Sequence, residues 1–99
     1  MADTTPQYLD EAFRQVSKEL TELFIKKHHD YGKDNILDIE ELGIAFRTSE
    51  KIARVRNLLK DNKSPENEPI EETWKDIAVY AIIALLYKRG WFQKLELKK

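Results

Sequence analysis

The stretch IAVYAIIALLY, from Ile77 to Tyr87, decides the fold of this 99-residue chain. Its residues are apolar almost all round, a pattern typical of a helix that is buried on most of its sides. The run is too short to cross a bilayer, which takes about 20 apolar residues, so we expect no membrane partner. Few other helices fit in a chain of this length, so we expect a homo-oligomer, with a dimer favoured.

Signals for the ends of this helix lie on either side of the stretch. Acidic residues follow Pro69, and the basic pair Lys88-Arg89 precedes Gly90, so the pattern predicts a helix from about 69 to 89 that stops at Gly90. The polar, proline-bounded segment at about 62–69 is predicted to be a linker. We expect Trp91 and Phe92 to pack on the core or on a partner, and the tail at about 93–99 to be frayed.

Two more helices are predicted upstream. Thr5-Pro6 is a start signal, and apolar residues then follow at alternating spacings of four and three, namely Leu9, Phe13, Val16, Leu20 and Leu23. This seam predicts a helix over about 6–29. A second helix is predicted over about 38–61, with an apolar face made of Ile44, Ile52, Val55 and Leu59. The segment 30–35 is predicted to be a loop because Gly, Asn and Asp favour turns. The fold class is therefore all-α: three main helices in a small bundle, within one domain over 1–99, completed by oligomerisation.

Composition excludes several classes of function. The 17 basic and 18 acidic residues are nearly balanced, so we expect no nucleic-acid partner. The chain contains no cysteine, which excludes disulfides, thiolate chemistry and a zinc ribbon. The N-terminus has neither a basic start nor an apolar block, so no signal peptide is predicted and we expect a cytoplasmic location.

Charged residues of the second predicted helix form a stripe that could bind phosphate. Spacings of three, one and three place them within an arc of roughly 100°: Arg47, Glu50, Lys51 and Arg54. Arginine makes bidentate contacts to phosphate and lysine supplies a point charge. We therefore interpret Arg47, Lys51 and Arg54 as phosphate-binding candidates.

Carboxylates on the last two predicted helices could hold a metal ion. Glu72, Asp76 and Tyr80 are four residues apart and share one helix face. Polyphosphates bind through Mg²⁺, which takes carboxylate oxygens as ligands, and Glu50, Glu72 and Asp76 are the candidates. The same charged residues also suit an ion-pair seam between packed helices, and both interpretations stay open.

Other polar residues have narrower interpretations. Asp30, Tyr31 and Asn35 could contact the sugar or base of a nucleotide, or could simply cap a turn. Adjacent His28 and His29 point to different sides of a helix, so a solvated helix end suits at least one of them better than a metal site. We find no glycine-rich phosphate loop and no nucleophile–base–acid triad, so any catalysis would be metal-assisted.

Three motifs resemble one known family. They are Lys27-His28-His29-Asp30-Tyr31-Gly32, then Arg47, Glu50-Lys51, Arg54 and Asn57-Leu58-Leu59, then Pro69-Ile70-Glu71-Glu72-Thr73, Asp76-Ile77-Ala78 and Tyr80-Ala81-Ile82. In this order they resemble the nucleotide modification associated domain, type one, a phage and bacterial family. The resemblance runs from about Leu23 to Phe92. It implies a link to nucleotide metabolism and no particular reaction.

The helical design is also similar to the all-α nucleoside triphosphate pyrophosphatases of the MazG and dimeric dUTPase type. Those enzymes bind Mg²⁺ through Glu-x-x-Glu on one helix and Glu-x-x-Asp on the next. Here Glu50 is followed at that spacing by Ala53, and Glu72 and Asp76 are four apart, so the full ligand set is missing. We therefore expect a nucleotide-phosphate-binding helical protein, with Mg²⁺-dependent nucleotide (pyro)phosphohydrolysis as its chemistry if it is an enzyme. The alternative is a non-enzymatic interaction or inhibitor protein in which the charges form a structural ion-pair seam.

Overall fold

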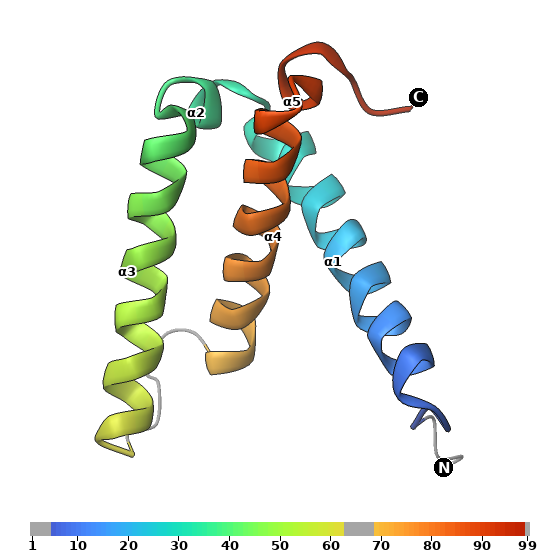
Figure 1. The fold of residues 1–99 in the computed structure, drawn as a ribbon, viewed down its shortest axis with the longest axis vertical. Coiled ribbons are helices and arrows are strands. Elements are labelled where there is room, and N and C mark those ends of the chain that lie inside the picture. The colour runs from blue at the N-terminus through green and yellow to red at the C-terminus, as the bar shows by residue number, and fades with distance from the viewer. Residues whose placement is uncertain (1–4, 63–68, 99) are drawn as a thin grey trace.

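The computed structural model describes residues 5–62 and 69–98, and these are mostly helical with no strand among them. The helices are α1 (Leu9–Tyr31), α2 (Asp34–Leu37), α3 (Glu40–Lys60), α4 (Ile70–Lys88) and α5 (Trp91–Lys94). α3 and α4 lie side by side, whereas α1 contacts α4 from about its own middle to its C-terminal end and diverges from it toward its N-terminus (Figure 1). The all-α prediction with three main helices is confirmed.

α1 is shifted along the chain relative to the predicted helix at 6–29. It begins at Leu9 and continues through Tyr31 because the N–H of Gly32 still bonds to the carbonyl of His28 at 2.8 Å. Gly32 then has φ 68° and ψ −155°, a conformation open essentially to glycine alone. Gly32 therefore ends α1 and turns the chain toward α2.

The predicted loop at 30–35 is wrong at both of its ends. Asp30 and Tyr31 form the last turn of α1, and Asp34 and Asn35 begin α2. α2 buries Ile36 in the core, and this burial stabilises a helix too short to persist alone. The predicted helix at 38–61 is α3, which starts at Glu40. Of the predicted linker at 62–69, residues 63–68 lie outside the described residues.

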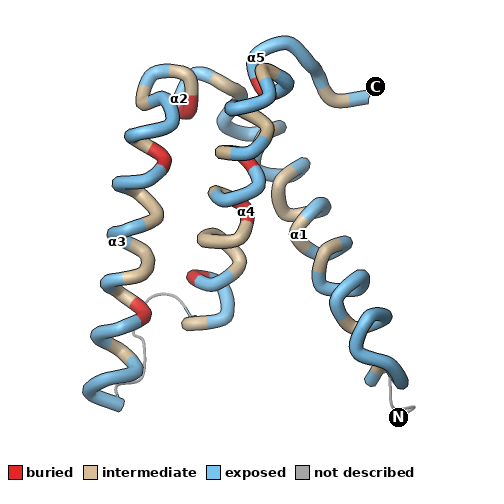
Figure 2. Tube along the Cα trace, viewed as in Figure 1, coloured by how far each residue is buried: buried red, intermediate tan, exposed pale blue. Residues whose placement is uncertain are grey.

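The core lies where the C-terminal halves of α1 and α4 meet α2, α5 and the first turns of α3 (Figure 2). Its buried residues are Ile36, Ile44, Val79, Ile83 and Phe92. On α3, Ile44 and Val55 are buried as predicted, but Leu59 is exposed. The reason is visible in Figure 1, where the last turn of α3 extends past the start of α4 and has no helix against it.

α4 ends as predicted. Its C-terminus is followed by Gly90 in the left-handed conformation, with φ 76°. Phe92 then folds back into the core, while Trp91 stays about half exposed beneath the guanidinium of Arg89. The predicted fraying over 93–99 is wrong for the first residues of this tail. Gln93 belongs to α5, and its carbonyl accepts a hydrogen bond from Lys33. In the described part of the chain, no helix has the length and apolar character needed to cross a membrane.

Candidate functional site: a cationic pocket between α1, α3 and α4

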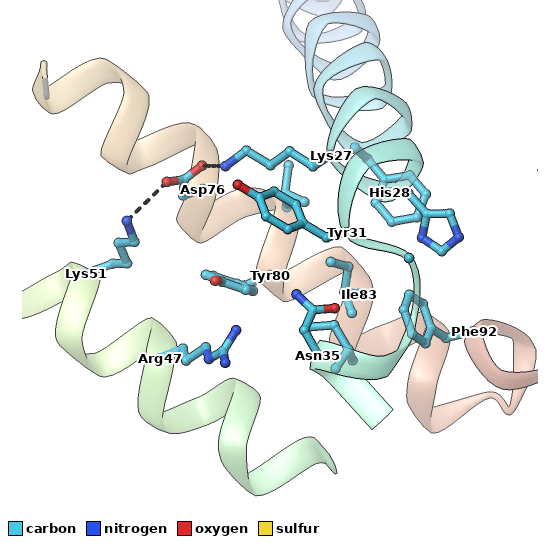
Figure 3. Close-up of a pocket in the computed structure, with 14 residues that line it drawn as sticks. Lys27, His28, Tyr31, Asn35, Arg47, Lys51, Asp76, Tyr80, Ile83 and Phe92 are labelled. Atoms are coloured by element: carbon cyan, nitrogen blue, oxygen red, sulfur yellow. Dashed lines mark hydrogen bonds and ion pairs between the residues drawn. The ribbon is translucent and has the colours of Figure 1, made fainter. Parts of the chain in front are cut away.

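A pocket of about 270 Å³ opens between the end of α1, the middle of α3 and the middle of α4 (Figure 3). The residues lining it come from all five helices. Its polar lining is Lys27, His28, Tyr31, Asn35, Arg47, Lys51, Asp76 and Tyr80, and its apolar lining includes Phe24, Ile36, Val79, Ile83 and Phe92. The volume is just below the roughly 300–1,000 Å³ typical of small-molecule sites.

Asp76 is the electrostatic centre of this pocket. Its Oδ1 accepts a hydrogen bond from Nζ of Lys27 at 2.7 Å, and its Oδ2 lies 3.2 Å from Nζ of Lys51. The Asp76 side chain is only 12% exposed. One carboxylate on α4 therefore links an ammonium on α1 to an ammonium on α3 (Figure 3).

This environment shifts the titration of Asp76. Burial alone would raise the pKa of its carboxyl group, because removal from water disfavours the charged form. The hydrogen bonds and positive charges of Lys27 and Lys51 outweigh burial and hold the pKa of Asp76 below its ordinary value. Asp76 is therefore ionised at neutral pH.

Arg47 is the third cation of the pocket. Its half-buried side chain extends from α3 toward Asn35 and Tyr80 (Figure 3). It makes no side-chain hydrogen bond or ion pair with any residue that the structure describes. The guanidinium therefore keeps its donors available to a ligand.

The opposite end of the pocket is aromatic. The ring of His28 packs against Phe24, with centroids 5.4 Å apart, and meets Phe92 edge-on at 5.9 Å. Tyr31 also lines the pocket and is largely exposed. The pocket thus joins a cationic end to an apolar end, an arrangement suited to a ligand that is both charged and partly flat.

The structure separates the predicted phosphate-binding residues into two groups. Arg47 and Lys51 line the pocket, whereas Arg54 does not. Arg54 instead donates from Nε to Oγ1 of the fully buried Thr73 at 3.2 Å. Its position indicates a structural contact between α3 and α4.

The predicted sugar- and base-binding residues are also divided. Tyr31 and Asn35 line the pocket, but Asp30 is exposed outside it and lies 3.5 Å from Nδ1 of His29. His29 is exposed. This agrees with the prediction that at least one of the two histidines lies at a solvated helix end.

The predicted metal ligands do not converge within one chain. Glu50 and Glu72 are exposed and lie outside the pocket lining. Among the residues that the structure describes, no three Asp, Glu, His or Cys side chains are grouped so that they could hold a metal ion. Of the three candidates, only Asp76 is in the pocket, and lysines contact both of its oxygens.

Sequence reasoning missed three residues of this region. Lys27 comes four residues after Leu23, so it occupies the next position of the apolar seam, and a cation there signals a partly buried partner. The spacing did not indicate which of the two histidines would be covered, and His28 is the one that packs against Phe24 and Phe92. Thr73 carries no sequence signal of its burial, because a hydroxyl that bonds to a neighbouring helix leaves no trace in spacing.

These features define an all-α protein with a mixed-polarity pocket that is lined by three cations and one carboxylate. Residues 27–87 match the family called nucleotide modification associated domain 1, and the chain belongs to that family. The domain is therefore associated with nucleotide modification. The matched region contains every residue that lines the pocket except Phe24 and Phe92. No curated protein and no solved structure matches the chain.

Proposed function

We propose that the pocket binds a nucleotide through its phosphate group. The observation that carries this proposal is that Lys27, Arg47 and Lys51 line one open cavity together with a single carboxylate, Asp76, which contacts the two lysines. These are the charged side chains among the described lining residues, so with neutral histidine the pocket has a surplus of two positive charges.

The roles of the cations follow from their contacts. Arg47, which is available for bidentate hydrogen bonds, makes the directional contact to the phosphate oxygens. Lys27 and Lys51 supply positive charge, and Asp76 keeps both ammonium groups at the pocket wall. An anion that entered here would replace water around cations that are already ordered, which lowers the entropic cost of binding.

The surplus charge favours a phosphate monoester. Such a group carries about −1.5 to −2 charges at pH 7, which matches the cations that Asp76 does not neutralise. The sugar and base would then lie toward Tyr31, Asn35 and the aromatic end of the pocket. A nucleoside monophosphate is therefore the ligand that suits both the charge and the small volume.

Calorimetric titration tests this proposal directly. We expect deoxynucleoside 5′-monophosphates to bind the wild-type chain in the presence of EDTA, and the same nucleosides without phosphate to bind at least tenfold more weakly. If no nucleotide binds, with or without Mg²⁺, the proposal is wrong.

Mg²⁺-dependent (pyro)phosphohydrolysis is a second candidate for the same pocket, since Asp76 lies in its wall and a carboxylate there suits Mg²⁺. A metal ion would have to displace the lysine contacts of Asp76 and recruit further oxygen ligands from the nucleotide, from water or from another copy. If this occurs, Mg²⁺ will increase affinity for di- and triphosphates, and Asp76→Asn will remove that increase, whatever its effect on binding in EDTA.

The contact between Lys27, Asp76 and Lys51 equally supports the alternative of an interaction protein, because it joins three helices without any ligand. Under that alternative, no nucleotide binds the wild type or Asp76→Asn, and the substitution changes only the melting temperature. Titrations of the wild type and of Asp76→Asn, each with EDTA and with Mg²⁺, therefore distinguish nucleotide binding, Mg²⁺-dependent hydrolysis and a purely structural role.

A further inference from the structure

The N-terminal half of α1 leaves a long apolar surface uncovered. Leu9 is 87% exposed and Phe13 75% exposed, and Val16 is exposed beside them. They lie on the same helix face as Leu20 and Leu23, which pack against the core. The face changes from covered to bare because α1 diverges from α4 toward its N-terminus (Figure 1).

An apolar groove runs between α1 and α4 next to this surface. It has a volume of about 210 Å³, and its lining is apolar except for one hydroxyl: Leu20, Thr21, Phe24, Val79, Ile82 and Leu86. On α4, Trp74, Ile82 and Leu85 are exposed as well. The groove is thus continuous with bare apolar residues on both helices that form it.

The chain is more open than a compact monomer of its size. Its accessible surface is 8175 Å², whereas a compact monomer of 11.7 kDa exposes about 5,900 Å². Its radius of gyration is 15.5 Å, against about 13 Å for a compact domain of this length. The excess area is on the order of 2,000 Å², well above the roughly 800 Å² that each partner buries in a standard interface.

We infer that a second copy of this chain covers this surface and that α1 forms the centre of a two-fold dimer. The bare seam of one copy, Leu9, Phe13 and Val16, packs into the α1–α4 groove of the other, and the symmetry repeats the contact. A second copy is the occupant because an excess of this size matches the large, apolar interfaces of obligate homodimers. A two-fold interface also needs one self-complementary surface, and here seam and groove lie side by side on the same chain.

Light scattering coupled to size exclusion tests the inference with a matched pair of variants. We expect wild type to elute with the mass of two chains at 10–100 µM, a range on the order of ordinary purification concentrations. Phe13→Glu should elute as a monomer, because a charge in the seam would be buried without a partner. Phe46→Glu, which changes a 63% exposed phenylalanine on α3, should remain a dimer.

Three outcomes would overturn the inference: a monomeric wild type, a dimeric Phe13→Glu, or dissociation by Phe46→Glu alone. If Phe13→Glu fails to fold, the wild type alone still tests whether the chain forms a dimer. Its melting temperature must rise with protein concentration, as it does for any assembly that dissociates on unfolding, and a melting temperature independent of concentration would count against the dimer.

Discussion

Lys27 and Asp76 lie 49 positions apart in the chain, yet their side chains meet at 2.7 Å. This contact ties the end of α1 to α4, and Lys51 extends it to α3 through the other carboxylate oxygen. Asp76 therefore contributes both to the pocket and to the position of α1. Substitutions at and around Asp76 can separate these two roles.

Asp76→Asn should lower the free energy of unfolding by about 1–2 kcal/mol, because two ammonium groups lose the charge that they share. For a domain of this length, that corresponds to a fall in melting temperature of roughly 4–16 °C. Thermal unfolding followed by circular dichroism measures it. Asp10→Asn is the control, since Asp10 pairs with Arg14 on the open surface of α1 and its loss should change little.

Acid should destabilise the wild type through Asp76. Its pKa is lower in the folded chain than in the unfolded chain, so its contribution to stability is complete above the unfolded value of about 3.9. That contribution is lost as the pH falls through the folded pKa. The difference in unfolding free energy between wild type and Asp76→Asn should therefore be constant from pH 7 to pH 5 and shrink below about pH 4. A difference that shrank between pH 7 and pH 5 would contradict the lowered pKa.

Arg47→Ala should weaken nucleotide binding by about 10- to 100-fold, the equivalent of losing a charged hydrogen-bonding group worth about 1.5–3 kcal/mol. Its effect on stability should be small, because Arg47 makes no side-chain hydrogen bond or ion pair within the described part of the chain. Arg56→Ala is the matched control, since Arg56 is an exposed arginine of the same helix outside the pocket. Equal losses in the two variants would show only a general charge effect.

Thr73→Val should destabilise the fold by about 1–3 kcal/mol, since it removes the buried hydroxyl that accepts from Arg54 and keeps the shape. Thr73→Ser keeps that acceptor and loses only a methyl group, at a cost of about 1 kcal/mol. Chemical denaturation compares the two. A valine variant as stable as the serine variant would mean that the contact with Arg54 contributes little.

Gly32→Ala should cost about 1–3 kcal/mol, because a φ of 68° with a ψ of −155° is a conformation for which an L side chain is strained. No atom outside its chain neighbours lies within 4 Å of a Cβ added there, so the cost comes from the backbone alone. At Gly90, where φ is 76° and ψ 5°, asparagine should be tolerated better than alanine. At Gly32 asparagine should give no such relief. Chemical denaturation of the four variants measures these differences.

Much of this fold follows from local rules. The helix α4 and its stop at Gly90 were predicted correctly because they depend on residues that mark the ends of helices and on one backbone preference. The break between α1 and α2 was misplaced because polar residues such as Asp30 and Asn35 are compatible with both turns and helix ends. Burial of Ile36 against distant helices decides the matter, and spacing along the chain does not reveal it.

The pocket was only partly predictable for a related reason. Arg47, Lys51 and Asp76 are found by helical spacing, since each lies on a face that borders the core. Helical spacing does not say which face of a second helix will meet that face, so Glu50 and Glu72 were grouped with Asp76 although they lie outside the pocket. Lys27 was not predicted as a pocket residue, although a lysine that continues an apolar seam can be recognised from its spacing alone.

α1 is a 23-residue helix, and at 1.5 Å per residue it forms a rod about 35 Å long. One end of this rod contributes Lys27 and Tyr31 to the pocket, and the other carries Leu9 and Phe13. A small tilt where the rod is anchored becomes a displacement of several ångströms at its far tip. Any change in the tilt of α1 at the pocket would therefore move Leu9 and Phe13 farther than it moves Lys27 and Tyr31.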